Sequence, residues 1–394
     1  MPNQQYIRML ESKDVIFEIF ARATERKRAV GEENVYDFSL GNPSVPAPDE
    51  VKEAVMRITK NTDPVELHSY SPAGGIPSVR KAIADDLNKR FGMSYEARHI
   101  FMTCGASAAL AHAFRAVCSP GETILTFAPC FSEYETYVTG AGYRFKVVPP
   151  DPASFQIPFS LTEELLTEDV AAVLINSPNN PSGVVYTTKT IEKLSEMLLR
   201  KEKEFSHPIY LISDEPYREI LFSGTDSPYI ARYYPNTITC YSFSKSLSLP
   251  GERIGYAAVN PAAEGADILS AVFTQISRVT GHNGAPALWQ RTAAQTCMRT
   301  ADLSVYEKNR NLLLRELSSY GYSIVPPGGT FYMFPKAPGG DAAAFCRKAM
   351  EKDLLLVPGN GFGCPDHFRI AYCVPTRRIE KSLPVFRELL HTAG

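Results

Sequence analysis

The chain has 394 residues, of which 44% are hydrophobic and 21% charged, and its formal net charge is only -2. A chain of this length exceeds the usual size of one core and predicts two domains or one large elaborated domain. The composition is that of an ordinary globular protein, and the small net charge argues against a nucleic-acid or acidic-membrane partner.

Targeting and metal-binding signals are weak. The first twenty residues lack the basic-then-apolar order of a signal peptide, and no apolar run approaches the roughly 20 residues that span a bilayer. The eight cysteines contain no CxxC pair, which is typical of reduced thiols in a cytosolic protein. The seven histidines show no HxxxH or HxH spacing. We therefore expect a cytoplasmic protein without a metal site and without a membrane anchor.

Helix-like and strand-like segments alternate along the chain. Residues 76–91 carry apolar side chains at helical spacing, namely Val79, Ile83, Leu87 and Phe91. Residues 171–178 and 209–216 are short β-rich runs that end in polar residues, and residues 190–205 between them predict a helix. Strand, helix and strand in this order predict a mostly parallel sheet covered by helices on both faces. Ligands of such sheets bind outside the carboxyl ends of the strands, where these polar residues are expected.

The stretch YSFSKSLSLPGERIGY, residues 241–256, places Lys245 just past another predicted strand. A P-loop is excluded because no glycine precedes the Lys-Ser pair. A lysine can instead form a Schiff base with an aldehyde cofactor, and partial burial would lower its pKa so that it acts as nucleophile and base. Ser242, Ser244 and Arg253 would supply the hydroxyls and the bidentate cation that a cofactor phosphate needs.

Pyridoxal phosphate is the cofactor that requires this set of groups. Its pyridine nitrogen needs an acidic partner, which Asp214 offers at the end of a predicted strand. Tyr217 and Asn180 offer hydrogen bonds to the phenolate oxygen, and Phe131 offers an aromatic face for the ring. Each residue alone has a purely structural alternative, because Asp214 could cap a helix, Asn180 could form a turn before a proline, and Phe131 could belong to the core.

The stretch MTCGASAAL, residues 102–110, offers a second set of phosphate donors at the start of a predicted helix. Gly105, Ala106 and Ser107 stand where this helix begins, so that free backbone N–H groups can bind an anion there. The ordered combination of all these elements is what favours a pyridoxal-phosphate site over the structural alternatives.

The chain resembles the class I/II aminotransferases of the pyridoxal-phosphate fold-type I superfamily, in the aspartate aminotransferase-like group. The resemblance runs from DFSLGNPSVPAP to FRIAYC, and its other motifs are YSPAGGIPSVRKAI, TCGASAAL, SPNNPSG, SDEPY, SFSKSLSLPGERIGY, PPGGTFYMF and VPGNGFG. It implies an α/β fold with a mostly parallel seven-stranded sheet between helices, plus a smaller α+β domain. The expected division is residues 1–45 as N-terminal arm and part of the small domain, 46–285 as the large cofactor-binding domain, and 286–394 as the small domain.

The resemblance also implies roles for individual residues. Lys245 matches the lysine that holds the cofactor and moves a proton, and Asp214 matches the partner of the pyridinium nitrogen. Tyr217 and Asn180 match the pair at the phenolate oxygen, and Arg369 in FRIAY matches the arginine that binds the substrate α-carboxylate. The residues that match the phosphate site are Ala106, Ser107, Ser242, Ser244 and Arg253.

Other matches concern the subunit partner and the substrate. Tyr70 matches a tyrosine that reaches the phosphate of the neighbouring subunit, which implies a homodimer with shared active sites. Gly41 and Asn42 match the mobile segment over the substrate. Phe131 departs from the Tyr or Trp of many relatives, which leaves stacking possible but removes a hydroxyl or indole contact. Arg278 in QISRVTGHNGAP is similar in place to the arginine with which aspartate aminotransferases bind a second carboxylate from the partner subunit.

The implied activity is transfer of an amino group between an L-amino acid, with aspartate or glutamate favoured, and a 2-oxo acid by a ping-pong mechanism. Two enzyme alternatives use the same residues, a β-eliminating C–S lyase and an amino-acid decarboxylase. A third alternative is the effector-sensing module of a transcription regulator. It is disfavoured because it would need a DNA-binding domain ahead of the resemblance, which starts at Asp37.

Overall fold

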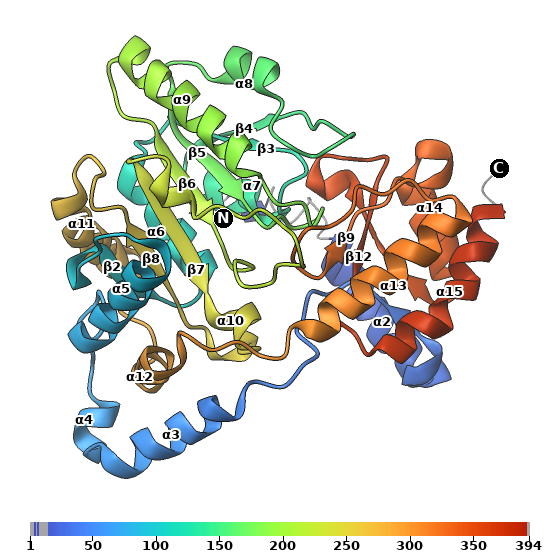
Figure 1. The fold of residues 1–394 in the computed structure, drawn as a ribbon, viewed down its shortest axis with the longest axis horizontal. Helices are drawn as coiled ribbons and strands as arrows, with labels where there is room; N and C mark the ends of the chain where they lie inside the picture. The colour runs from blue at the N-terminus through green and yellow to red at the C-terminus, as the bar shows by residue number, and fades with distance from the viewer. Residues whose placement is uncertain (1–3, 5, 8–14, 392–394) are drawn as a thin grey trace.

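The computed structural model describes residues 4, 6–7 and 15–391 of the chain. Its larger part is a sheet flanked by helices, on the left-hand side of Figure 1. The strand order is β2-β8-β7-β6-β5-β3-β4, and all neighbours are parallel except the two pairs that β8 makes with β7 and β2. The strands are β2 (Ile100–Thr103), β3 (Thr123–Phe127), β4 (Arg144–Val148), β5 (Val170–Asn176), β6 (Tyr210–Asp214), β7 (Thr237–Ser242) and β8 (Gly255–Val259). The predicted α/β class with a mostly parallel seven-stranded sheet is confirmed.

Both faces of this sheet are buried. Ala172 and Leu174 of β5 pack with Ile212 of β6 on one face, and Val173 packs with Leu211 on the other, as the two-residue period of a strand requires. Burial on both faces explains why these strands are almost continuously apolar. The first face is covered by α6 (Ala106–Val117) and α11 (Ala266–Thr280), the second by α5 (Pro77–Phe91) and α9 (Thr188–Phe205). Shorter helices follow β3, β4 and β7, namely α7 (Glu133–Gly140), α8 (Phe159–Leu165) and α10 (Phe243–Ser246).

The helix boundaries follow local sequence signals. Helix α5 starts with Pro77 in its first turn and ends at Gly92, whose φ of 65° is left-handed. Helix α9 is capped by Thr187, whose side chain accepts a backbone hydrogen bond from the first turn. The helices predicted at 76–91 and 190–205 are therefore confirmed, and the β-rich runs on either side of the second are β5 and β6.

The smaller part of the molecule lies on the right-hand side of Figure 1 and is built from segments near both ends of the chain. Strand β1 (Tyr36–Asp37) pairs in parallel with β10 (Leu354–Leu355), and a second small sheet has the order β11-β12-β9. Its strands are β9 (Tyr332–Met333), β11 (Val357–Pro358) and β12 (Phe368–Ala371). The helices here are α2 (Val15–Val30), α13 (Ser304–Tyr320), α14 (Ala342–Met350) and α15 (Thr376–His391).

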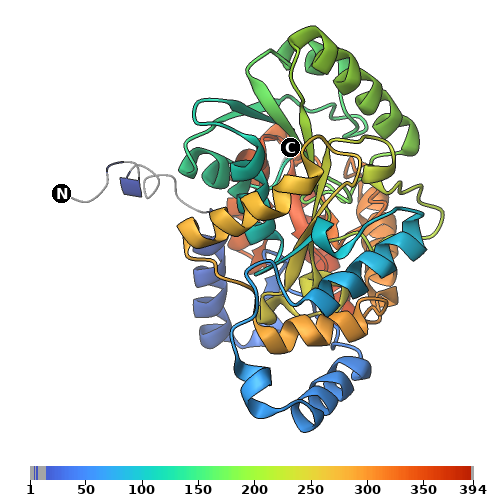
Figure 2. The same cartoon turned by 90° about the vertical axis from the view of Figure 1, so that its left-hand side faces the viewer.

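Helices α3 (Asp49–Asn61) and α4 (Pro64–His68) lie at the edge of the molecule, at the bottom of Figure 2. Both contact α12 (Ala287–Thr296), which also packs on α5. This segment of the C-terminal third therefore lies beside the large sheet. The domain boundaries expected after residues 45 and 285 stay a prediction.

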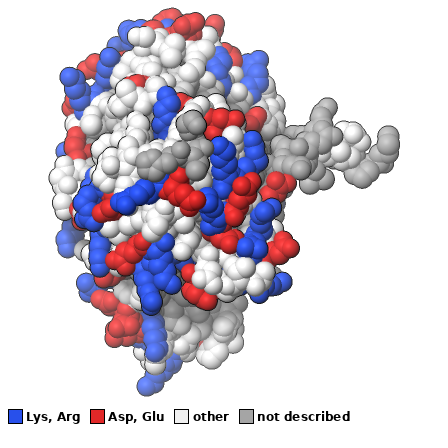
Figure 3. Space-filling model, turned by 90° about the vertical axis from the view of Figure 1, so that its right-hand side faces the viewer, with Lys and Arg blue, Asp and Glu red and all other residues white. Residues whose placement is uncertain are grey.

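The surface is mixed in charge. On the face in Figure 3, acidic and basic side chains are interspersed over the described residues. Across residues 4, 6–7 and 15–391, no helix is long and apolar enough to cross a membrane. The same residues contain no group of three or more His, Cys, Asp or Glu side chains placed to hold a metal ion.

The loop after β2 packs closely on β8 at Gly255, and a substitution there can test this packing. A Cβ atom at this position would lie 2.2 Å from the carbonyl oxygen of Tyr241 and 2.9 Å from Cα of Gly105, both backbone atoms. We predict that Gly255→Ala lowers the free energy of unfolding by about 1–3 kcal/mol through overpacking. Gly251→Ala is the control, because a Cβ there meets nothing within 4 Å. Equal denaturant midpoints for the two variants would contradict the prediction.

Candidate active site

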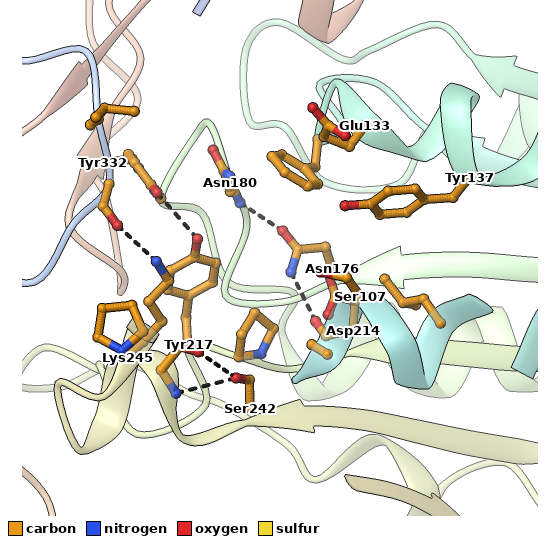
Figure 4. A pocket seen from close by; sticks show the side chains of 18 of the residues that line it. Ser107, Glu133, Tyr137, Asn176, Asn180, Asp214, Tyr217, Ser242, Lys245 and Tyr332 are labelled. Carbon is orange, nitrogen blue, oxygen red and sulfur yellow. Dashed lines mark hydrogen bonds between the residues drawn. The ribbon is translucent and has the colours of Figure 1, made fainter. Parts of the chain in front are cut away.

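A cavity of about 310 Å³ lies at the carboxyl ends of β5, β6 and β7. It is the edge at which ligands of parallel sheets bind. The structure brings together, in its lining, most of the residues predicted from the sequence: Gly41, Ala106, Ser107, Phe131, Asn180, Asp214, Tyr217, Ser242, Ser244, Lys245, Arg253 and Arg369. Figure 4 shows Lys245 and Tyr217 on one side of the cavity and Tyr137 and Glu133 on the other.

Asp214 ends β6 with its carboxyl group buried. One oxygen, Oδ2, accepts a 2.5 Å hydrogen bond from the hydroxyl of Tyr134, and Oδ1 has no hydrogen-bond partner among the described residues. Burial raises the pKa of Asp214 to about 7, against the smaller lowering effect of the Tyr134 bond. A buried oxygen without a donor is costly, so this site is complete only when a further donor reaches Oδ1.

Arg369 on β12 is connected to the sheet by a chain of side-chain amides. Asn176 donates to the backbone oxygen of Asp214 (2.8 Å) and accepts from the backbone N–H of Asn180 (2.7 Å). The guanidinium of Arg369 donates to Oδ1 of Asn180 (3.0 Å) and to the backbone oxygen of Ser39 (2.6 Å). Within the part of the chain that the structure describes, its buried Nε has no partner. These two bonds fix the orientation of the guanidinium and use two of its five N–H donors.

Lys245 lies in the short helix α10, which follows β7 directly and is not a loop. Ser242 caps this helix, because its hydroxyl accepts a hydrogen bond from the backbone N–H of Ser244. The Nζ of Lys245 donates to the backbone oxygen of Gly41 (2.7 Å), and burial lowers the pKa of Lys245 to about 8. Gly41 has no room for a side chain, since a Cβ would lie 1.7 Å from the hydroxyl oxygen of Tyr332.

The start of α6 and the end of β7 form a cluster of anion donors. The hydroxyls of Ser242 and Ser244 lie 2.7 Å apart, and the guanidinium of Arg253 donates to Ser244 at 3.4 Å. Gly105 precedes α6 with a φ of 83°, and a Cβ there would lie 2.8 Å from an Arg253 nitrogen. Gly105 does not line the cavity itself, but its lack of a side chain lets Arg253 approach the helix N-terminus.

Sequence reasoning missed several residues of this site. Tyr134 and Tyr137 lie three residues apart in α7, and Phe131 lies three residues before Tyr134, a spacing that could have suggested a shared side. Tyr332 bonds to the hydroxyl of Tyr217 at 3.2 Å, and it lies in a motif already identified, PPGGTFYMF. Ser39 holds Arg369 through its backbone oxygen, and such a contact leaves no signal in the sequence.

Besides Gly105, three predicted residues do not line the cavity. Tyr70 is fully exposed, at 103% of its reference area, and Arg278 is exposed near the end of α11. Asn42 also lies outside the lining set. The roles predicted for Tyr70 and Arg278 require a second subunit, so they stay predictions.

Residues 33–384 match the family described as Aminotransferase class I and II. The chain belongs to this family. It is 30% identical to a probable aspartate/prephenate aminotransferase of Thermus aquaticus over 94% of each chain. The structure is similar to that of an amino transferase from Eubacterium rectale, with a TM-score of 0.97, 43% identity and coverage of 100% of both chains. It is also similar to an aspartate aminotransferase from Thermus thermophilus with maleate, with a TM-score of 0.84, 26% identity and coverage of 96% of this chain and 97% of the other.

Family membership makes the protein a pyridoxal-phosphate-dependent transaminase that acts on amino acids and 2-oxo acids. The sequence-based assignments of family, cofactor and activity are confirmed, and the lyase and decarboxylase alternatives are not favoured. The residues present fit this cofactor. Oδ1 of Asp214 lacks the donor that a protonated pyridine nitrogen would provide, and the hydroxyls and guanidinium at the start of α6 suit its phosphate.

The raised pKa of Asp214 predicts how the cofactor-free protein responds to pH. Its ordinary value is 3.8 and its value in the folded protein is about 7, so between these values the folded state binds the proton more tightly. The contribution of Asp214 to the free energy of unfolding is therefore fully present at low pH. It is lost as pH rises from about 4 to about 7, and the total loss is roughly 4 kcal/mol. We predict that Asp214→Asn removes this part of the slope in denaturant titrations.

Tyr134→Phe provides the matched comparison. It removes a hydrogen bond that favours the charged carboxylate, so the loss of stability should move to higher pH. Identical pH profiles for the wild-type protein and Asp214→Asn would contradict the assignment of the raised pKa to Asp214.

Proposed function

We propose that the chain is a homodimeric, cytoplasmic aminotransferase in which Lys245 carries the cofactor, Asp214 pairs with its ring nitrogen and Arg369 binds the substrate α-carboxylate. The observation that supports it most is the position of two buried polar atoms that have no partner among the described residues. Oδ1 of Asp214 and Nε of Arg369 both belong to side chains that line one cavity with Lys245. Two cavity-lining side chains, one with an unpaired acceptor and one with an unpaired donor, fit a ligand that carries a protonated ring nitrogen and a carboxylate.

Each residue in this proposal has a defined task. Arg369 is held by Asn180 and by the Ser39 backbone, so it can receive a carboxylate without reorganising. The amine of Lys245, with a pKa of about 8, is partly neutral near neutral pH and can take the proton from Cα of the amino acid. The cofactor, when bound, supplies an electron sink for the pair left on Cα. The hydroxyl of Tyr217 would donate to the phenolate oxygen from its place beside Tyr332.

For the substrate we propose a dicarboxylic amino acid, aspartate or glutamate. Relatives at 28–30% identity are named aspartate aminotransferase or aspartate/prephenate aminotransferase. Among the described residues, the cavity lining contains only three basic side chains, and Lys245, Arg253 and Arg369 already have other tasks in the proposal. A cation for the second carboxylate would therefore come from the partner subunit, and Arg278, which is exposed on α11, is the candidate.

The dimer in this proposal also accounts for exposed apolar side chains. Tyr70, Val65 and Val279 are at least three-quarters exposed in the single chain. A second copy that covers α4 and the end of α11 would bury them and bring Tyr70 to the neighbouring cavity.

A donor screen tests the function as a whole. The purified holoenzyme is incubated with 2-oxoglutarate and each of a panel of amino acids, and the 2-oxo acid products are measured. We expect aspartate to be the best donor and sedimentation to give a dimer. Release of ammonia and pyruvate without an added oxo acid would indicate a lyase, and release of CO₂ would indicate a decarboxylase.

Lys245→Ala should abolish covalent attachment of the cofactor and lower kcat by at least about a hundredfold, because the proton acceptor is lost. No other lysine is among the described residues of the cavity lining. Borohydride reduction of the wild-type holoenzyme followed by peptide mapping should place the cofactor on Lys245. A cofactor adduct on any other lysine would overturn the assignment.

Arg278→Leu should lower kcat/KM for aspartate by about a hundredfold or more and spare alanine, because a desolvated carboxylate would lose its counter-ion. Arg98→Leu is the control, since Arg98 is also exposed and lies near Asp267, close to the other end of α11. If the ratio of kcat/KM for aspartate over alanine is the same in both variants, Arg278 does not select dicarboxylates.

A further inference from the structure

A buried hydrogen-bond chain outside the cavity lining reaches Ser246, the residue next to Lys245. The hydroxyl of Tyr241 lies 2.8 Å from the hydroxyl of Ser246 and 2.7 Å from a carboxylate oxygen of Glu219. Tyr241 and Ser246 are buried, and the Glu219 side chain is only 9% exposed. None of these three residues lines the cavity, so the chain does not contact the ligand.

The far end of this chain is fixed by charge. Glu219 accepts from Arg90 (3.0 Å) and Arg218 (3.3 Å), and Arg218 also lies over the ring of Tyr241 at 4.2 Å. Burial alone would raise the pKa of Glu219, but these two arginines lower it below its ordinary value, so the carboxylate is ionised. An ionised carboxylate only accepts hydrogen bonds. Tyr241 must therefore donate to Glu219 and accept from Ser246, which gives every bond of the chain one direction.

We infer that Tyr241 is a positioning residue for Lys245: it holds Ser246, and with it the four-residue helix α10, against the buried charge cluster of Glu219. A helix of one turn has little stability of its own. Its orientation depends on such contacts, which include the bond from the backbone N–H of Ala301 to the oxygen of Ser246 (2.7 Å). This inference rests on the role of Lys245 proposed above.

The expected consequence concerns the proton-transfer step. The Nζ of Lys245 must reach Cα of the amino acid in a narrow range of geometry, and displacement by a fraction of an ångström slows such a step. The contacts proposed for the ring nitrogen and the substrate carboxylate come from β6 and β12, and neither strand contributes a residue to the hydrogen-bond chain. Loss of the Tyr241 hydroxyl should therefore lower kcat and leave the KM of the amino acid nearly unchanged.

The test compares Tyr241→Phe with Tyr256→Phe. Tyr256 is also buried and packs 5.0 Å from the ring of Tyr241, but its hydroxyl accepts a 2.8 Å bond from Arg218 in the same cluster and does not hold Ser246. For Tyr241→Phe we expect a loss in kcat of about tenfold or more, with the KM of the amino acid within about threefold. The isotope effect with Cα-deuterated donor should rise, and the pH midpoint of the holoenzyme absorption titration should move. Tyr256→Phe should change neither kcat, the isotope effect nor the pH midpoint. It should lower Tm by about as much as Tyr241→Phe does.

Ser246→Ala is the second variant, because it removes the same bond from the other side with a smaller change. Its kcat and isotope effect should match those of Tyr241→Phe, and the double variant should lose no more than either single one, since the two changes remove one shared interaction. Equal kcat for the Tyr241 and Tyr256 variants, or additive losses in the double variant, would overturn the inference. Peptide mapping separates this result from failure of the Lys245 assignment, which would place the cofactor on another lysine.

Discussion

The buried carboxyl group of Asp214 is the constraint on which the rest of the site depends. This carboxyl group is hydrogen-bonded on one oxygen by Tyr134 and left without a donor from the described residues on the other, and burial raises its pKa to about 7. In the cofactor-free protein, Asp214 is therefore partly ionised near pH 7. A cationic ring nitrogen at Oδ1 would favour the charged form, so cofactor binding and ionisation of Asp214 are coupled. In the proposed site the same coupling would keep the ring nitrogen protonated, and a protonated ring is the better electron sink.

The sheet topology explains how distant residues meet at this carboxyl group. Strands β5, β6 and β7 are parallel and adjacent, so Asn176, Asp214 and Ser242 end at one edge although the chain separates them widely. The reversed strand β8 returns beside β7 and brings Gly255 against the loop before α6. Arg369 comes from the small sheet and is joined to the segment after β5 through Asn180. The proposed cofactor contacts thus belong mainly to the large sheet, and the proposed contact of Arg369 with the substrate carboxylate depends on how the smaller part packs against that sheet.

The sequence predicted the parts of this site that short motifs encode. Lys245 and Asp214 lie at or just past the ends of strands, so the alternation of strands and helices is enough to place them at the carboxyl edge of the sheet. Arg369 had no such signal, and only the family resemblance pointed to it. Tyr134 was missed because its function is a contact with a residue 80 positions away, which no local pattern reports. Arg278 and Tyr70 remain predictions for a different reason, since a single chain cannot show what a second chain would complete.

The charges of the cavity constrain where substrate selectivity arises. Among the described residues, its lining holds three basic and two acidic side chains, and one of the acids is Glu133 on the wall opposite Lys245. Arg369 is engaged by Asn180 and Ser39, Arg253 by Ser244, and Lys245 by Gly41. A second substrate carboxylate would meet an acidic wall and no unassigned cation from the described part of the same chain. If the substrate is a dicarboxylate, as proposed, the positive charge for its second carboxylate would come from the neighbouring subunit. Without that charge, the apolar and aromatic part of the wall would favour an uncharged side chain.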